Sequence, residues 1–486
     1  MKPFPLPWVP NPTDRPCLYA RQCGSCQYQG IDYPRQLETK QQLAQRLLGR
    51  FGPVDPILGM DIPYHYRNKV QAAFSPDRRQ WAVSGLYQPH PHRLVPVDSC
   101  QLEDQTADRI VRTIRELMPG FHLEAYDDRS RRGMLRHVLV KRAFSTGQVM
   151  VVLVTSQLVF PSRKHFVQAL LERHPEITTV LQSVNDRFTS MVLGESLRVL
   201  HGPGFIEDRL CGCRFRISAK SFYQVNPAQT EKLYTTALQM AGLTGRERVV
   251  DAYCGTGTIG LVASRRARQV IGVEINRDAI RDAVANARLN GIENARFLCA
   301  DAGQWMDGAA AGKEPIDLVF LDPPRAGCDQ RFLTSLAILS PPRIVYISCN
   351  PETQARDLEF LLGKGYRVKR IQPVDMFPHT RHVETVVLLS KGEIDSKKVR
   401  VEFSLEDMDM SGFQKGATYE QIKAYVLKHT GLKVSSLYIS QVKRKCGLDV
   451  GQNYNLSKKE NAKVPQCPPE KEAAIVEALK YFQMLE

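Results

Sequence analysis

One cysteine stands where an apolar run gives way to a loop, and a thiol in that position could act as a nucleophile. Residues 345–347 favour β-structure, and Ser348-Cys349-Asn350-Pro351 follow them directly. The pattern predicts a buried strand whose end presents the Cys349 thiol. A lone cysteine after an apolar run is more often a small buried hydrophobe. The residues that the fold brings beside it must therefore decide between these two interpretations.

Carboxylates stand at the ends of two further strand-like runs. Residues 316–321 are followed by Asp322-Pro-Pro-Arg325, and Glu384 begins the run over residues 384–390. Open α/β sheets bind their ligands at the carboxyl ends of the strands. A thiol and a carboxylate on one such edge could combine nucleophilic attack with proton removal. The simpler interpretation of Glu384 is a surface carboxylate at the start of an edge strand.

A glycine-rich turn precedes these residues in the chain. Asp251-Ala-Tyr253-Cys-Gly-Thr-Gly-Thr258-Ile-Gly links a strand to a helix, and a second strand ends in Glu274 about twenty residues later. This is the pattern of a first βαβ unit in a Rossmann-like sheet, where the acid can bind ribose hydroxyls. The spacing also permits a dinucleotide. S-adenosylmethionine fits better, because Asp251 precedes the turn and Asp301 ends a third strand.

Four cysteines near the N-terminus have a spacing that could hold a metal centre. Cys17, Cys23 and Cys26 lie within ten residues, and Cys100 is the fourth candidate. Four thiolates suit either zinc or an iron–sulfur cluster. A zinc ribbon normally closes with a second Cys-x2-Cys pair, so the single returning cysteine favours a cluster. The alternative is a group of unligated thiols.

Three groups of elements must position these side chains. We expect an α+β module of mixed sheets over residues 1–220, a Rossmann-like α/β domain over residues 221–391 and a small helical domain over residues 400–486. In the first, the pattern predicts a helix at 33–51 and strands at 81–87, 137–141, 149–155 and 179–185. In the second, Asn226-Pro227 begins a helix. In the third, we expect helices at 417–430, 434–446 and 470–482.

The C-terminal helices allow two interpretations. Ser435 and Ser436 could cap a recognition helix of a helix-turn-helix, which ends in Lys443-Arg-Lys445. The alternative is a helical appendage that packs on the enzyme. Residues 392–486 hold 15 Lys+Arg against 13 Asp+Glu, a net charge of only +2.

Composition and charge narrow the class of protein. The net charge is +15, so residues 1–391 carry the remaining +13, as expected for a polyanionic partner such as a nucleic acid.

Twelve cysteines without a secretory leader do not indicate a disulfide framework. The N-terminus is broken by prolines, which argues against a signal peptide, and no run of 18 apolar residues predicts a membrane span. We therefore expect a cytoplasmic protein, a monomer that does not associate with membranes.

The most specific of these motifs resemble a known family. The chain is similar to the S-adenosylmethionine-dependent RNA uracil-5-methyltransferases over residues 15–391. The motifs that carry the resemblance are SFYQVN at residue 221, DAYCGTGTIGL at 251, LDPPRAGC at 321, YISCNPETQARD at 346 and FPHTRHVETV at 377. The four N-terminal cysteines resemble the set that holds a [4Fe-4S] cluster in the ribosomal-RNA branch, a set that the transfer-RNA branch typically lacks.

The resemblance implies a reaction and a role for each matching residue. The enzyme would methylate carbon 5 of a uridine in RNA, most specifically 23S ribosomal RNA, through a covalent Cys–uracil adduct. Cys349 would be the nucleophile and Glu384 the base. Cys17, Cys23, Cys26 and Cys100 would hold the cluster, with zinc as the alternative. S-adenosylmethionine would be bound by Gln224, Tyr253, Thr258, Glu274, Asp301 and Asp322.

Other functions remain open at this point. The same reaction on transfer RNA is one, and a catalytically silent iron–sulfur RNA-binding protein is another. A DNA cytosine-5-methyltransferase normally presents its cysteine after proline and has a Glu-Asn-Val motif. That motif is absent here, and the one Pro-Cys pair, Pro16-Cys17, is in the cysteine-rich loop. An amino-methyltransferase would keep a similar Pro-Pro motif but would not need Cys349.

Overall fold

The chain forms two compact units, Met1–Asp395 and Ser396–Glu486. The computed structural model describes residues 17–88, 93–187, 191–391, 419–448, 466–482 and 484–485. The N-terminal stretch whose prolines argue against a signal peptide lies outside these ranges. None of the described helices is both long enough and apolar enough to cross a membrane.

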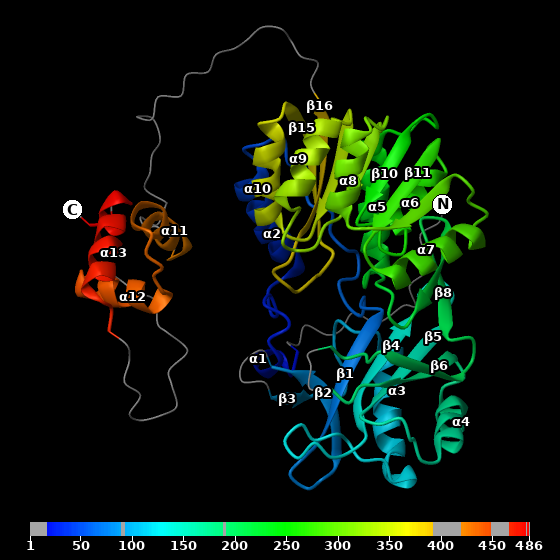
Figure 1. Cartoon of the computed structure of the whole chain (residues 1–486). Coiled ribbons are helices and arrows are strands. Elements are labelled where there is room, and N and C mark those ends of the chain that lie inside the picture. The colour runs from blue at the N-terminus through cyan, green and yellow to red at the C-terminus, as the bar shows by residue number, and fades with distance from the viewer. Residues whose placement is uncertain are drawn as a thin grey trace. The chain divides into compact units, whose positions relative to one another are not determined.

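The larger unit contains a seven-stranded sheet of Rossmann-like topology (Figure 1). The strand order is β12-β11-β10-β13-β14-β16-β15. Strands β12 to β14 are parallel, whereas β16 runs antiparallel to both β14 and β15. The predicted strands that end in Glu274, Asp322 and Cys349 are confirmed. The strands are β10 (Arg248–Ala252), β11 (Gln269–Glu274), β12 (Ala295–Cys299), β13 (Leu318–Leu321), β14 (Arg343–Ser348), β15 (Tyr366–Val374) and β16 (Glu384–Lys391).

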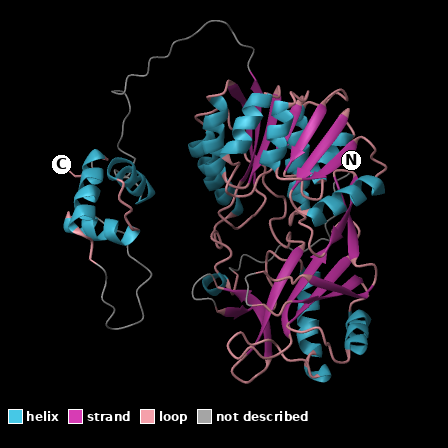
Figure 2. Cartoon of the chain, viewed as in Figure 1, coloured by secondary structure: helices cyan, strands magenta, loops and turns pink. Residues whose placement is uncertain are grey.

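Helices pack on both faces of this sheet (Figure 2). Along β14, Val345 and Ile347 join one core cluster, while Ile344 and Tyr346 join the other. This alternation follows from the two-residue period of a strand, and it explains why these runs are apolar throughout. Helices α5 (Pro227–Ala241), α6 (Thr258–Ser264) and α7 (Arg277–Leu289) contribute to the first cluster. Helices α8 (Ala302–Ala311), α9 (Gln330–Leu339) and α10 (Pro351–Leu362) contribute to the second.

A second seven-stranded sheet is formed by residues 69–201, in the order β3-β2-β1-β4-β5-β6-β7. All its neighbouring strands are antiparallel except β5 and β6, which α4 (Arg163–Arg173) connects. With α3 (Gln105–Leu117), α4 buries a separate apolar core. The strands are β1 (Lys69–Pro76), β2 (Ala82–Tyr87), β3 (Leu94–Pro96), β4 (Leu135–Arg142), β5 (Val149–Thr155), β6 (Ile177–Val184) and β7 (Ser196–His201). A short helix, α1 (Ala20–Cys23), precedes them, and a 3-10 turn, Pro119–Phe121, follows α3.

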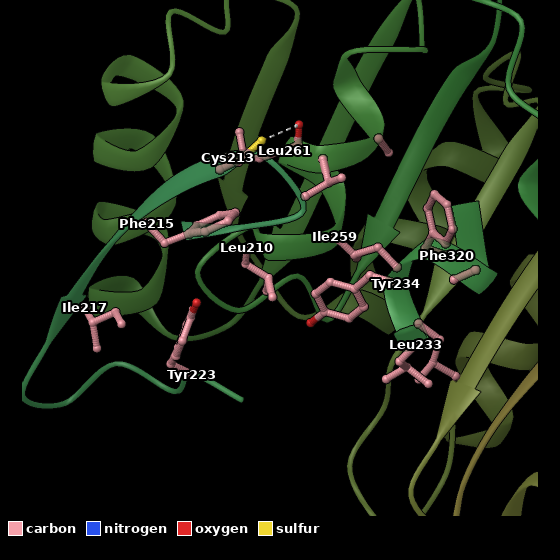
Figure 3. Packing of buried hydrophobic residues seen from close by; sticks show 14 of the residues in the cluster. Leu210, Cys213, Phe215, Ile217, Tyr223, Leu233, Tyr234, Ile259, Leu261 and Phe320 are labelled. Carbon is pink, nitrogen blue, oxygen red and sulfur yellow. Dashed lines mark hydrogen bonds between the residues drawn. The ribbon is translucent and has the colours of Figure 1, made fainter. Parts of the chain in front are cut away.

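One of the apolar clusters joins the two sheets. A hairpin, β8 (Phe205–Leu210) and β9 (Cys213–Ser218), packs Phe215 and Leu210 beside Tyr223, Tyr234 and Ile259 (Figure 3). The same cluster includes Met150 and Leu181 of the second sheet. This cluster extends across residue 220, and the division of the chain at that position stays a prediction.

Helix α2 (Tyr33–Leu48) packs with the Rossmann-like sheet, although its place in the sequence predicts that it belongs to the N-terminal module. Leu48 belongs to the core on the α10 face of that sheet. Val54 and Leu58, which follow the helix, form bridges to Ile371 and Val374 of β15. Apolar burial thus places residues 33–58 beside a strand more than 300 positions later in the chain.

The smaller unit contains three described helices around its own core. They are α11 (Tyr419–Thr430), α12 (Ser436–Lys445) and α13 (Pro469–Tyr481), close to the predicted ranges. Ser435 caps α12, since its side chain accepts a hydrogen bond from the Tyr438 amide. Ile422, Ile439 and Ile475 form the centre of this core.

Candidate active site

The sheet order brings the candidate residues to one edge. The chain reverses direction across the sheet between β10 and β13, which is the topological switch point where open α/β sheets bind ligands. Tyr253, Asp322 and Cys349 each follow the carboxyl end of a parallel strand. Because β16 is antiparallel and pairs Thr385 with Ser348, its first residue, Glu384, begins at this same edge. The antiparallel strand thereby explains how a strand start and three strand ends meet.

The glycine turn after β10 has the geometry of a ligand cradle. Gly255 and Gly257 have φ angles of 53° and 78°, which glycine adopts at little cost. The Gly255 amide donates to Glu274 Oε2 at 3.1 Å, and the Gly260 amide donates to Asp251 Oδ2 at 2.9 Å. The other oxygen, Asp251 Oδ1, is buried without a hydrogen-bond partner in the described part of the chain. A buried carboxylate oxygen of this kind suits a cationic ligand such as S-adenosylmethionine.

Three carboxyl groups at this edge have raised pKa values. Burial raises the pKa of Asp251 to about 8 and that of Asp322 to about 7. Burial, reinforced by Asp322, raises the pKa of Glu384 to about 8, although Arg325 opposes the shift. Burial thus favours the protonated, neutral forms of these carboxyl groups, and a cationic ligand at this edge would favour their ionised forms.

Cys349 lies among groups that act on its thiol in opposite directions. Burial raises its pKa most, and Glu384 and Asp322 add to the shift. Arg325 lowers the pKa through its charge and a side-chain hydrogen bond. The Arg325 carbonyl accepts hydrogen bonds from the side chains of Asn350 and Thr353, both at 3.1 Å, which ties the Pro-Pro-Arg loop to α10. Among the described residues, Arg325 is therefore the cation that favours the thiolate form of Cys349.

The other predicted ligand-binding residues lie around the same turn. Thr258 Oγ1 is 3.0 Å from the Tyr234 hydroxyl, which also interacts with the Gln224 side chain. Tyr253 has a φ of 64°, and burial, then Cys328, Asp329 and Asp301 among its neighbours, raise its pKa. Asp301 also caps α8, since its side chain accepts from the Gln304 amide. All six predicted residues thus cluster at one edge of the sheet, while their roles stay predictions.

Tyr234 was missing from the sequence-based set, although it is fully buried against Thr258 and close to Asp322. It lies inside α5, where a tyrosine is indistinguishable from an ordinary core residue in the sequence. Asp251 was expected at the site because it precedes the glycine turn, and Arg325 stands in the Asp322-Pro-Pro-Arg325 segment at the same edge. The glycine turn and the Pro-Pro pair thus pointed to their neighbours, whereas nothing in the sequence of α5 pointed to Tyr234.

The four N-terminal cysteines are near one another but form no complete metal site in the described residues. No group of three or more His, Cys, Asp or Glu side chains there is placed to hold a metal ion. Burial raises the pKa of Cys26 to about 11, and Cys23 and Cys17 are close enough to add to this shift. Cys26 and Cys100 both pack on the small cluster of Met60, Tyr66 and Leu102. The four thiols therefore converge on one region, and the cluster stays a prediction.

The sequence matches known RNA methyltransferases. Residues 200–392 match the family model described as tRNA (Uracil-5-)-methyltransferase. An uncharacterised RNA methyltransferase of Halalkalibacterium halodurans is 41% identical over 385 residues, which cover 78% of this chain and 84% of that protein. An uncharacterised RNA methyltransferase of Clostridium acetobutylicum is 42% identical over 386 residues, with the same coverage of both chains.

A solved structure is similar as well. The tRNA (uracil-54, C5)-methyltransferase of Pyrococcus abyssi, in complex with S-adenosyl-L-homocysteine, superposes with a TM-score of 0.62 at 28% identity. The match covers 74% of this chain and 84% of that one. The site geometry, the family model and these relatives agree. The chain belongs to the RNA (uracil-5-)-methyltransferases, S-adenosylmethionine-dependent enzymes that methylate carbon 5 of uracil in RNA.

Proposed function

We propose that this enzyme methylates a uridine of ribosomal RNA through a covalent adduct between Cys349 and the uracil ring. The observation that carries the proposal is the meeting of Cys349, Glu384 and Arg325 at the sheet edge beside the glycine turn. A methyltransferase acting on an exocyclic amine would need neither the thiol nor the base.

The chemistry of uracil explains why both groups are needed. Carbon 5 is too weak a nucleophile to take a methyl group directly. The Cys349 thiolate adds to carbon 6, forming a C–S bond and moving the electron pair of the ring toward carbon 5. Carbon 5 then takes the methyl group of S-adenosylmethionine, and S-adenosylhomocysteine leaves. The Glu384 carboxylate removes the proton from carbon 5, and the returning electron pair expels the Cys349 thiolate.

The remaining residues have supporting roles in this proposal. Arg325 favours the thiolate before attack. S-adenosylmethionine is held by Asp251 and by the predicted set Gln224, Tyr253, Thr258, Glu274, Asp301 and Asp322. Cys17, Cys23, Cys26 and Cys100 hold an iron–sulfur cluster, with zinc as the alternative, which would tie the N-terminal segment to the Cys100 loop. The target base must leave its stack to reach Cys349.

Transfer RNA is the second candidate substrate, because the Pyrococcus abyssi neighbour is named as a tRNA methyltransferase. The four-cysteine set favours ribosomal RNA. Mass mapping of 5-methyluridine in both RNAs, from cells with and without the gene, decides between them. Loss of the modification from ribosomal RNA alone is the expected result, and loss from transfer RNA alone would refute the choice.

The covalent step has its own test. With RNA that contains the mapped uridine, Cys349→Ala should abolish both methylation and the denaturation-resistant protein–RNA adduct. Cys467→Ala, in the smaller unit, is the matched control and should retain both. Full methylation by Cys349→Ala would exclude the thiol mechanism.

A further inference from the structure

The base loop, residues 375–383, connects the end of β15 to Glu384, the first residue of β16. Within it Asp375, Met376, His379 and Thr380 are buried. His379 has a φ of 66°, in the left-handed region that costs free energy for a residue with a side chain. Such strain persists only where the surroundings fix the conformation, and it gathers at functional sites. Other parts of the chain must therefore hold this loop in place.

One face of helix α2 provides much of that fixation. Tyr33, Gln36 and Lys40 are three and four positions apart, so their side chains lie on the same face of the helix. Gln36 and Lys40 are completely buried. Burying an amide and an ammonium costs free energy unless both are paired. Here all three side chains form hydrogen bonds with the base loop, at Asp375 or at His379.

Gln36 holds His379 at two points. Its Oε1 accepts a hydrogen bond from the His379 amide at 2.9 Å, and its Nε2 lies 3.1 Å from His379 Nδ1. Burial lowers the pKa of His379 to about 4, so the ring is neutral at pH 7. A neutral ring nitrogen can accept from the Gln36 amide. The strained residue is thereby fixed through both its backbone and its ring.

Further hydrogen bonds fix the neighbouring residues of the loop. Lys40 Nζ pairs with Asp375 Oδ1 at 2.6 Å and donates to the Phe377 carbonyl at 3.0 Å. The Tyr66 hydroxyl donates to the Pro378 carbonyl at 3.0 Å. From the segment after Cys26, the Tyr28 amide donates to the His379 carbonyl at 3.0 Å. Three consecutive carbonyls of the base loop are therefore bound by residues that precede position 70.

We propose that Gln36 is a positioning residue for the base, which fixes the strained turn at His379 so that Glu384 reaches the proton on carbon 5. This inference rests on the covalent mechanism proposed above. Cys349 follows β14 and is not part of the base loop, so attack and methyl transfer depend on the turn only through the effect of Glu384 on the thiol. Proton removal depends on the turn directly, because Glu384 begins the strand into which the loop leads.

Loss of the contacts between Gln36 and His379 should slow mainly one step, the release of methylated RNA after proton removal. Gln36→Leu keeps roughly the volume of the side chain but removes both contacts to His379, together with the hydrogen bonds that Gln36 donates to the Tyr28 and Ile31 carbonyls. In single-turnover reactions with labelled S-adenosylmethionine, methyl transfer to RNA should change less than about threefold, while release of methylated RNA should slow by about tenfold or more, as misplacement of a catalytic group by about 1 Å can cause. Methylated protein–RNA adduct should accumulate on denaturing gels.

Gln41→Leu is the matched control on the same helix. The Gln41 side chain likewise bonds backbone groups of a following segment, the Asp55 carbonyl and the Ile57 amide, but neither belongs to the base loop. It should release methylated RNA at the wild-type rate. Tyr66→Phe removes only the hydroxyl that binds the Pro378 carbonyl, so it should trap less adduct than Gln36→Leu. This milder variant tests the same inference if Gln36→Leu does not fold.

The outcomes separate the inference from the mechanism on which it rests. Glu384→Gln should trap methylated adduct, and its failure to do so would overturn the proposed role of Glu384 itself. If Glu384→Gln traps adduct but Gln36→Leu and Tyr66→Phe do not, Gln36 has no positioning role. Equal slowing of methyl transfer and release in Gln36→Leu would likewise refute the inference, since it indicates general loss of structure.

Discussion

The protonation state of a single residue, Glu384, should control how fast the product leaves. Burial first, and Asp322 second, raise the pKa of its carboxyl from the ordinary value to about 8. Only the deprotonated form can accept the carbon 5 proton, so the active fraction grows as the pH rises. Below the pKa the rate of adduct resolution should rise about tenfold per pH unit and level off above about 8. Rapid-quench assays of adduct decay between pH 6 and 9 test this, and a rate that falls with pH would contradict it.

Replacing Glu384 by glutamine should separate the two halves of the reaction. Gln has nearly the same shape but cannot accept a proton, so methyl transfer proceeds and the adduct cannot break down. Denaturing electrophoresis combined with mass spectrometry should find a protein–RNA adduct that carries the methyl group. An adduct without methyl would assign Glu384 to an earlier step. Glu352→Gln is a suitable control, because Glu352 is an exposed carboxylate in the first turn of α10.

At the residue scale, sequence motifs located most of the site. Cys349, Asp322 and Glu384 stand at strand boundaries, and the parallel sheet rule gathers such boundaries at one edge. Tyr234 could not be found, since its hydroxyl meets Thr258 only after α5 packs on the sheet. Nor could Gln36 be linked to His379, because 343 positions separate them and no local pattern encodes the pairing.

At the scale of elements, the contact between helix α2 and the base loop depends on a buried ion pair. Lys40 and Asp375 have side chains with no exposed surface, and the hydrogen-bonded distance is 2.6 Å. Removing one partner leaves an uncompensated buried charge, which typically costs about 3–5 kcal/mol. Lys40→Met should therefore lower the thermal transition of the larger unit markedly in scanning calorimetry.

An exposed ion pair provides the control for Lys40. Arg50 and Glu359 lie 3.0 Å apart with about three-fifths of each side chain exposed, 59% and 61%. Exposed pairs contribute roughly 0–1 kcal/mol, because water and salt screen them. Arg50→Met should shift the transition little. Equal shifts for Arg50→Met and Lys40→Met would show that the buried pair has no special structural role.

Most elements were predictable because their periodicity is local. The helix predicted at residues 33–51 is α2, Tyr33–Leu48, and the strand predicted at 149–155 is β5. Partner choice was not predictable, and α2 packs on β15 rather than on the N-terminal sheet. Local sequence specifies which face of a helix is apolar, whereas the distant strand that covers it is decided by the whole fold.

At the scale of the molecule, charge should govern RNA binding. Residues 1–391 carry a net +13 of the total +15, and RNA binding by such a surface releases counterions. If about six phosphates are neutralised, affinity should fall by roughly a thousandfold between about 50 and 200 mM salt. Fluorescence anisotropy with a labelled RNA stem-loop measures the slope. A flat response would argue against a surface that follows the phosphate backbone.

The smaller unit should be separable from the larger one. Its core is made by α11, α12 and α13, and all the described residues of that cluster lie between Tyr419 and Leu485. A chain that ends at Asp395 should therefore keep the calorimetric transition of the larger unit and its rate of methyl transfer at saturating RNA. The exposed basic residues Arg444 and Lys445 end α12, so RNA affinity at low salt is the property that removal of this unit can weaken. Loss of the larger unit's transition on truncation would show that the two units fold as one.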